Sequence, residues 1–354
     1  MPKPSPAPRS KARNIAVIGA GMAGISCART LAQAGHRVTV FEQGDVVGGR
    51  MATVDSPFGG FDSGAQYFTV RDARFARALE TVPGLCKRWS ANTVRVLDEL
   101  GRVAAAGLPA REPHWVPIPG MQALVAAWAG PLLDAGCIDL QSRVTHIEKD
   151  ALGGQRWQLR TQGAGDGQRV APGFDAVLLA LPAPQTWDLL RASKLAAHFK
   201  TLEAVQVAPC WTLMLAFPQA MQANLSALGP QWNAARSTHH RVAWLARESS
   251  KPGRGAVERW TVQASAAWSA EHLQDDDTRA EAKLLKAFSE VTGIRAAPTH
   301  VQTRRWLYAQ TTQPLGKSHL WHAASGIGLC GDWCLGHRVE NAFVSGLELA
   351  LAVL

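Results

Sequence analysis

Apolar runs of two kinds alternate at the start of the chain and predict a parallel α/β unit. Residues 14–18 form a short, continuous apolar run, which is typical of a strand buried on both faces. An apolar stretch of helical length then extends to Ala34 and stops at Gly35, and residues 36–41 predict a second strand. The order strand, helix, strand indicates a βαβ unit.

A glycine-rich turn joins the first predicted strand to the helix. The turn reads G-x-G-x-x-G, and an acid, Glu42, stands at the end of the second strand. Glycines let the backbone approach a pyrophosphate at the helix N-terminus, and the carboxylate can accept hydrogen bonds from ribose hydroxyls. The motif alone is weak evidence, but its strand, helix and acid together predict a nucleotide site. The predicted contacts are Gly19, Gly21, Ala23, Gly24, Glu42 and Gln43.

A second glycine pair follows this unit closely and narrows the choice of nucleotide. Gly48 and Gly49 precede Arg50 and Met51. NAD needs no such second segment, whereas a flavin enzyme uses one to bring more backbone and a cation against the same pyrophosphate. The predicted contacts are Gly49, Arg50 and Met51, since the forked guanidinium suits a phosphate or the flavin itself. The alternative is a surface turn with an incidental arginine.

A third motif near the C-terminus completes the prediction of tightly bound FAD. An apolar run from residue 327 ends at Asp332, whose carboxylate can bond a ribitol hydroxyl. A helix rich in small residues is predicted to follow, with Val339, Glu340 and Ala342 in its first turn. The positive end of that helix dipole can face the flavin pyrimidine edge, where it favours the anionic, reduced flavin.

Several further segments carry a family resemblance. They read Gly-Gly-Arg-Met at 48–51, Asp-Ser-Gly-Ala-Gln-Tyr-Phe-Thr at 62–69, Trp-Leu-Ala-Arg at 244–247, Trp-Leu-Tyr at 306–308 and Cys-Gly-Asp-Trp-Cys at 330–334. Together with the opening motif, these segments closely resemble renalase, above all its bacterial branch, over nearly the whole chain. Renalases belong to the wider class of monoamine-oxidase-like FAD-dependent oxidoreductases, so the resemblance implies that fold.

The resemblance implies an activity that glycine spacing cannot indicate. It implies an FAD-dependent oxidase of 2- or 6-dihydro isomers of NAD(P)H, with dioxygen as acceptor and with hydrogen peroxide and NAD(P)+ as products. An amine oxidase or a flavin desaturase of the same class is the alternative. The chain has only two tyrosines, which counts mildly against an amine held between tyrosine rings. A third reading, a nucleotide-binding protein with an inactive site, is disfavoured by the intact motifs.

The resemblance also implies roles for individual side chains. Gln66 and Tyr67 are expected beside the flavin ring, and the backbone at Val144 against the adenine. Simple packing of Tyr67 and backbone bonding by Gln66 remain open. No protein acid or base is predicted, because the flavin carries the redox chemistry. The predicted substrate contacts are Tyr67, Trp244, Arg247 and Trp306.

Of these predicted substrate contacts, Arg247 has the plainest alternative. Its guanidinium could clamp a substrate phosphate or ribose, but an ordinary surface arginine would have the same sequence.

The predicted elements assign the chain to two interleaved domains of an α/β protein. The assignment is a tail at 1–13, a Rossmann-type FAD-binding domain at 14–69, 138–182 and 301–354, and an α+β substrate domain at 70–137 and 183–300. Within the first domain, residues 175–181 form a continuous apolar run that predicts a buried strand. The tail is rich in proline and basic residues, and we expect it to be disordered.

The substrate domain is expected to carry an antiparallel sheet. Residues 211–217, 242–246 and 260–264 read as strands, and residues 275–291 have apolar positions at helical spacing. The acidic start of that segment suits a helix N-terminus and needs no metal.

Composition serves here to exclude several kinds of partner, location and site. The net charge of +9 is scattered, so we expect no nucleic-acid partner but an anionic cofactor and substrate. No apolar run reaches the roughly 18 residues of a membrane span, and no secretory signal is evident, so a cytoplasmic protein is expected. The six cysteines lack the spacing of a metal site. The sequence of a covalent flavin attachment is missing as well, so noncovalent FAD is expected.

Overall fold

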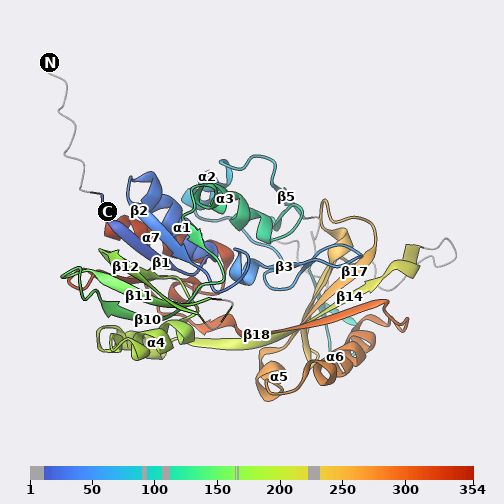
Figure 1. Cartoon of the computed structure of the whole chain (residues 1–354). Coiled ribbons are helices and arrows are strands. Elements are labelled where there is room, and N and C mark those ends of the chain that lie inside the picture. The colour runs from blue at the N-terminus through green and yellow to red at the C-terminus, as the bar shows by residue number, and fades with distance from the viewer. Residues whose placement is uncertain (1–11, 90–93, 106–111, 164, 166, 222–231) are drawn as a thin grey trace.

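The computed structural model describes residues 12–89, 94–105, 112–163, 165, 167–221 and 232–354. Most of the predicted disordered tail, residues 1–11, lies outside the described residues. The chain forms two halves side by side, one built on a parallel sheet and the other on a large antiparallel sheet (Figure 1). The predicted α/β fold with a Rossmann-type domain is confirmed.

The first half is built on a six-stranded sheet. In spatial order its strands are β19 (Leu320–His322), β20 (Ile327–Leu329), β13 (Ala176–Leu179), β1 (Asn14–Ile18), β2 (Arg37–Phe41) and β9 (Ile138–Asp139). All pairs are parallel except β19 with β20. The predicted apolar strand near residue 175 is β13, and it is buried throughout because β1 and β20 flank it.

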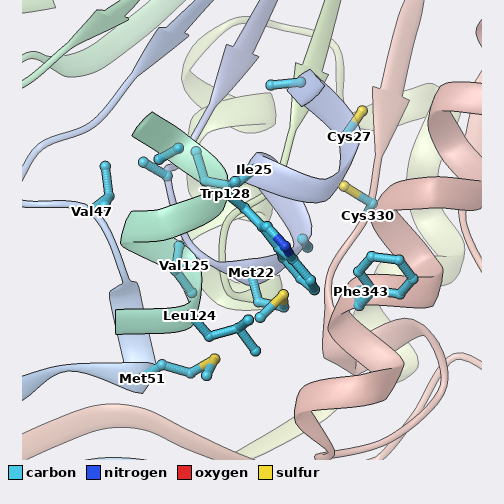
Figure 2. Close-up of a cluster of buried hydrophobic side chains, with 14 of the residues drawn as sticks. Met22, Ile25, Cys27, Val47, Met51, Leu124, Val125, Trp128, Cys330 and Phe343 are labelled. Carbon is cyan, nitrogen blue, oxygen red and sulfur yellow. The ribbon is translucent and has the colours of Figure 1, made fainter. Parts of the chain in front are cut away.

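Three helices form the core on one side of this sheet. They are α1 (Met22–Gln33), α3 (Gln122–Asp134) and α7 (Val339–Val353). In Figure 2, Trp128 of α3 lies between the α1 side chains and Phe343 of α7, with the Trp128 and Phe343 ring centroids 5.5 Å apart. A short helix, α2 (Ala73–Leu79), adds Phe75 to the same cluster. This packing holds the N-termini of α1 and α7 close together.

A smaller sheet and two helical segments cover the other side. The sheet contains β10 (Arg143–Lys149), β11 (Trp157–Gln162) and β12 (Gln168–Phe174). The helical segments are α4 (Ala183–Ala192) and η2 (Ala196–Ala204), and they share a buried apolar cluster with β1 and β13.

The second half is a seven-stranded sheet. Its order is β18 (His300–Gln313), β14 (Gln206–Phe217), β17 (Glu258–Ala264), β16 (Val242–Arg247), β15 (Ala234–Ser237), β6 (Arg95–Leu97) and β7 (Val103–Ala105). The three strands predicted for this region are confirmed, in β14, β16 and β17. Helices α5 (Ala266–Glu271) and α6 (Asp277–Thr292) pack on this sheet.

Helix α6 forms where the apolar spacing predicts it. The Asp276 side chain caps its start by accepting a hydrogen bond from Arg279 N at 2.8 Å, and Gly293 ends it with a φ of 75°. The buried side chains are the apolar set at helical spacing: Ala280, Leu284, Ala287, Phe288 and Val291. The acidic start is therefore a cap.

The remaining elements are short and lie in the connections between those described above. They are η1 (Gly49–Met51), β3 (Thr53–Val54), β4 (Phe61–Asp62), β5 (Cys86–Arg88), β8 (Trp115–Pro117), η3 (Pro218–Met221), η4 (Glu248–Ser250) and η5 (Asp332–Cys334). No helix in the described ranges is long and apolar enough to cross a membrane.

The structure differs from two of the predicted domain boundaries. Strand β18 pairs with β14 from His300 to Gln313, so the boundary at residue 301 cuts into a strand of the antiparallel sheet. Helix α3 falls inside 70–137, yet it packs on α1 and α7 of the nucleotide half. No local sequence pattern predicts the β18–β14 pairing or the packing of α3, because the partners are distant along the chain.

Candidate functional site

A cavity of about 1640 Å³ lies where the two halves meet. Its described lining comes from the glycine-rich turn after β1, the η1 segment, residues 64–69, strands β14 to β18 and the start of α7. Pockets for single drug-sized ligands are about 300–1,000 Å³, so this cavity has room for a dinucleotide and a second molecule. Most of the predicted cofactor contacts meet here.

The three glycines of the first motif have different physical roles. A Cβ added at Gly21 would meet nothing within 4 Å, because this residue faces the cavity. A Cβ at Gly19 would lie 2.7 Å from the Ala180 carbonyl oxygen, and φ at Gly19 is 105°. A Cβ at Gly24 would overlap the Gly19 carbonyl oxygen, so Gly24 serves helix-to-strand packing and does not line the cavity. Ala23 does line it.

The Glu42 carboxylate is held at the cavity wall by backbone donors. Its Oε2 accepts a hydrogen bond from Ala20 N at 2.7 Å, and its Oε1 accepts one from Gly44 N at 2.8 Å. Gln43 lines the same part of the cavity. A carboxylate fixed in this way keeps lone pairs free for ribose hydroxyls, as the sequence predicts.

Arg50 and Asp332, predicted to make separate contacts, form a bidentate ion pair. Nη1 of Arg50 lies 3.0 Å from Oδ2 of Asp332, and Nη2 lies 2.5 Å from Oδ1. Thr311 also donates to Asp332 Oδ2, at 3.3 Å. Both charged residues line the cavity, as do Gly49 and Met51, and Met51 also points toward Leu124 of α3 in Figure 2.

The N-terminus of α7 faces the cavity through Val339 and Ala342. Glu340, predicted to contact the cofactor, points elsewhere: its Oε1 accepts hydrogen bonds from the backbone N of Arg71 at 2.6 Å and of Asp72 at 2.7 Å. Glu340 therefore ties α2 to α7. Its charge also lies in the first turn of the helix, where the dipole favours it.

The segment from Gly64 to Tyr67 forms another wall of the cavity. The amide of Gln66 is fully engaged, because its Nε2 donates to the Asp62 and Gly64 carbonyl oxygens and its Oε1 accepts from Lys251 Nζ at 3.3 Å. Trp306, which also lines the cavity, donates from Nε1 to the Ser63 carbonyl at 2.8 Å. Gln66 thus lines the cavity and bonds backbone at once, which combines the two readings left open by the sequence.

A fully buried ionic cluster lies behind this segment, and sequence reasoning missed it. Lys251 Nζ lies 2.9 Å from Asp62 Oδ2 and 2.8 Å from Glu248 Oε1, and Arg254 Nη2 lies 2.7 Å from Asp62 Oδ2. We call Asp62, Glu248, Lys251 and Arg254 the buried cluster. Asp62 fell in a segment noted only for its family resemblance. Lys251 and Asp62 are 189 positions apart along the chain, so no local sequence pattern indicates that they meet.

The two carboxyls of the buried cluster have opposite pKa shifts. Burial alone would raise the pKa of Asp62, but the charges of Lys251 and Arg254 outweigh it and hold that pKa below its ordinary value. Burial raises the pKa of Glu248 despite the attraction of Lys251. Oε2 of Glu248 is buried and has no hydrogen-bond partner among the described residues. Asp62 is therefore the more readily ionised of the two carboxyls.

Aromatic rings line the cavity beyond Gln66. Tyr67 stacks on His114 with ring centroids 3.9 Å apart, and the Trp244 ring centroid lies 5.7 Å from that of Tyr67. Nε1 of Trp244 is buried and has no acceptor among the described residues. Burial, followed by the charge of Arg236, lowers the pKa of His114, so this ring is neutral at neutral pH. The predicted substrate contacts Tyr67, Trp244 and Trp306 are thus brought to one cavity.

Besides Gly24 and Glu340, two further predicted contacts lie outside the described cavity lining. Arg247 pairs through Nε with Glu258 Oε1 at 3.1 Å, and its guanidinium carbon lies 4.9 Å from the Trp260 ring centroid. The substrate clamp predicted for Arg247 therefore has no support in the geometry. Val144 is buried in the apolar cluster beneath the first sheet, where it shares a core with Phe41.

Sequence reasoning also missed the charged mouth of the cavity. Arg71, Glu112, Arg236 and Arg338 all line it. Arg71 Nη2 donates to Glu112 Oε2 at 2.7 Å, and the charge of Arg338 contributes to lowering the pKa of Glu112, after the hydrogen bond from Arg71. These residues come from four separate parts of the chain, so only the fold shows that arginines outnumber carboxylates here.

The cysteines give no sign of a covalent or metal site. In the described part of the cavity lining, Cys210 is the one cysteine, and burial raises its pKa to about 11. Burial likewise raises the pKa of Cys334. Thiolates are scarce at neutral pH under these conditions. Among the described residues, no group of three or more histidine, cysteine or acidic side chains could hold a metal ion.

The fold and the cavity define a protein with a Rossmann-type, dinucleotide-binding half. Residues 17–80 match the model of an NAD(P)-binding Rossmann-like domain. Residues 106–354, more than half of the chain, match the model for flavin-containing amine oxidoreductases, and the chain belongs to that family. Its cofactor is FAD.

Two curated relatives match short stretches of the chain. The chain is 47% identical over 66 residues to hydroxyneurosporene desaturase of Rhodobacter capsulatus, which is 18% of this chain and 13% of that protein. It is 57% identical over 44 residues to an L-amino-acid oxidase of Bungarus fasciatus, which is 12% of this chain and 8% of that protein. These proteins support an FAD-dependent oxidoreductase and do not identify the substrate.

Two solved structures resemble nearly the whole chain. One is described as "Putative protoporphyrinogen oxidase" from Exiguobacterium sp. 255-15, with a TM-score of 0.76 and 15% identity, covering 97% of this chain and 99% of that one. The other is a double mutant of putrescine oxidase, with a TM-score of 0.68, 13% identity and the same coverage. At these identities the likeness shows the fold alone.

The residues present fit FAD. The open space at Gly21 accepts a pyrophosphate, Glu42 faces the ribose, and Arg50, Asp332 and the α7 N-terminus offer charge and N–H groups farther along the cavity. When bound, FAD supplies the capacity to accept a hydride from a substrate. The protein's own part is to orient cofactor and substrate, and the aromatic wall at Tyr67 and Trp244 restricts water there.

Proposed function

We propose that this protein is an FAD-dependent oxidase resembling renalase. In this proposal it oxidises 2- or 6-dihydro isomers of NAD(P)H to NAD(P)+, with dioxygen as acceptor and hydrogen peroxide as product. The substrate gives up a hydride, and a proton from solvent completes the peroxide. The protein's partners are then a small dinucleotide and dioxygen.

The charge at the cavity mouth carries this proposal. Arg71, Arg236 and Arg338 line it, with Glu112 as the carboxylate that engages one of them. A dinucleotide brings phosphates, which arginine binds well, whereas a protonated amine would be repelled. A long apolar desaturase substrate would have to pass the same charged groups, which disfavours the second alternative as well.

The aromatic wall supports the same substrate. A nicotinamide is flat, and Tyr67, His114 and Trp244 present rings at one side of the cavity. The buried Trp244 Nε1 lacks an acceptor among the described residues, so a ligand carbonyl such as a carboxamide oxygen would satisfy it. The paired arrangement of these rings also leaves an amine substrate as the alternative to test.

A flavin-bleaching screen tests the proposed function. The purified yellow protein is mixed without oxygen, in a stopped-flow instrument, with 2-dihydro and 6-dihydro isomers of NADH and NADPH, with ordinary NADH, and with simple amines. We expect fast bleaching by the isomers, little by ordinary NADH, and peroxide once oxygen is admitted. Fast bleaching by amines and none by any dinucleotide would replace this proposal with the amine-oxidase alternative.

Removal of Arg236 should weaken substrate binding. We expect Arg236→Ala to raise the apparent KM for a dihydronicotinamide dinucleotide about 5-fold, which is the upper range for an exposed ion pair, and to leave flavin reduction at saturation nearly unchanged. The effect should shrink as salt is added. Arg279→Ala, an exposed arginine on α6 away from the cavity lining, is the matched control. Equal KM values for both variants would contradict a role for Arg236.

A further inference from the structure

A single residue, Gln66, lies between the buried cluster and the cavity. Lys251 Nζ contacts Gln66 Oε1 at 3.3 Å, and Gln66 lines the cavity where the flavin ring is expected. The side chains of Asp62, Glu248 and Lys251 are fully buried, and that of Arg254 is 1% exposed. The cluster takes no part in the proposed chemistry, and none of its four side chains is in the described lining of the cavity.

Buried cations outnumber buried carboxyls in and beside this cluster. The carboxyls are Asp62 and Glu248, and Glu248 Oε1 accepts hydrogen bonds from both Lys251 and Thr261. Lys251 and Arg254 are cations, and Arg259, also fully buried, bonds the carbonyl oxygens of Gly60 and Arg254. Positive charge is therefore in excess behind the segment from Gly64 to Tyr67.

We propose that the buried cluster positions Gln66 and places a net positive charge behind the flavin-facing wall, which raises the reduction potential of the bound FAD. Reduction adds negative charge to the cofactor, and a fixed cation in a dry interior stabilises that charge more strongly than one in water. Lys251 acts through Gln66 and is a positioning residue. The inference depends on FAD binding, and it does not depend on the dihydronicotinamide substrate.

The hydrogen bonds that remain around Asp62 indicate which variant of the cluster should fold. Removing Lys251 leaves Asp62 bonded to Arg254, to Met121 N at 2.8 Å and to Thr53 Oγ1 at 2.9 Å, and Glu248 Oε1 keeps the Thr261 hydroxyl as a donor at 2.8 Å. Methionine has nearly the same length and no charge. Lys251→Met should therefore retain the fold and FAD while it removes one cation from the cluster.

The test is the midpoint potential of bound FAD, measured by titration against a reference dye. We expect a lower potential in Lys251→Met than in the unmodified protein, with FAD still bound. Glu248→Gln keeps the size of that side chain and removes no cation, so the potential of this variant should not fall. Lys283→Met is the matched control, because Lys283 also pairs with a carboxylate, at 2.8 Å from Asp275, but lies on α6.

An unchanged potential in Lys251→Met would overturn the proposal, and so would an equal fall in Glu248→Gln or Lys283→Met. If Lys251→Met does not purify with FAD, Arg254→Met removes the other cation on Asp62 and is read in the same way. The result stays separate from the proposed function, because the titration uses no substrate. The expected fall in the midpoint potential of Lys251→Met would support this proposal even if the substrate screen favoured amines.

Discussion

Gly21→Val should yield a folded protein that no longer retains FAD. The backbone at Gly21 has φ of −77° and ψ of −175°, which valine adopts without strain. Its Cβ would extend into the cavity, where nothing lies within 4 Å, and would occupy the space that the pyrophosphate needs. We expect FAD affinity to fall by roughly 100-fold or more, about 2.7 kcal/mol. The flavin-to-protein absorbance ratio after gel filtration measures this loss.

Two variants at other glycines separate loss of the site from loss of the fold. Gly130→Val in α3 also adds a side chain to open space, but away from the cavity lining, and it should keep FAD. Gly24→Val should fail to fold, because its Cβ would overlap the Gly19 carbonyl oxygen. A Gly21→Val protein with a full complement of flavin would show that the cofactor does not bind at this turn.

Asp62→Ala should cost about 3–5 kcal/mol of folding free energy, as expected when one partner of a buried ion pair is removed. Asp62 accepts hydrogen bonds from Lys251, from both terminal nitrogens of Arg254 and from Met121 N. Without it, Arg254 loses the carboxylate that both its terminal nitrogens contact, and Lys251 keeps Glu248 alone. Urea unfolding, with FAD at the same concentration for each protein, gives the difference.

The pH dependence of this loss has a defined sign. The folded-state pKa of Asp62 lies below its ordinary value, so its stabilisation is fully present above that value and disappears as pH falls. The difference in unfolding free energy between Asp62→Ala and the unmodified protein should therefore become smaller below about pH 4. Asp275→Ala, on a surface carboxylate, should change stability little. A similar loss in both variants would count against the special role of the buried cluster.

The sequence predicts those parts of the fold that depend on local pattern. The βαβ unit, the buried strand at 176–179 and helix α6 are all visible as runs or periods within a few residues. The cofactor contacts at Gly21, Glu42 and Asp332 follow from motifs of fixed spacing, and the structure brings them to one cavity.

What the sequence could not predict depends on pairing at a distance. Arg247 looked like a clamp, but Glu258 on the neighbouring strand engages it, and Arg236 reaches the cavity instead. Glu340 looked like a cofactor contact, but it accepts the backbone N–H groups before α2. The buried cluster joins the end of β4 to the connection between β16 and β17, and no local pattern marks a lysine that will lose all contact with water. In each case the partner, and not the residue type, decides the role.

Strands β14 and β18 have a consequence for how a substrate enters. They stay paired from Gln206 with Gln313 to Ala216 with His300, and β18 supplies the cavity wall from Trp306 to Gln310. A long antiparallel ladder shared by wall and sheet resists bending, so this wall of the cavity moves only together with the sheet that carries it. A substrate therefore meets a fixed surface from Trp306 to Gln310, and local adjustment of the cavity falls to side chains outside this ladder, such as Arg71 and Arg236.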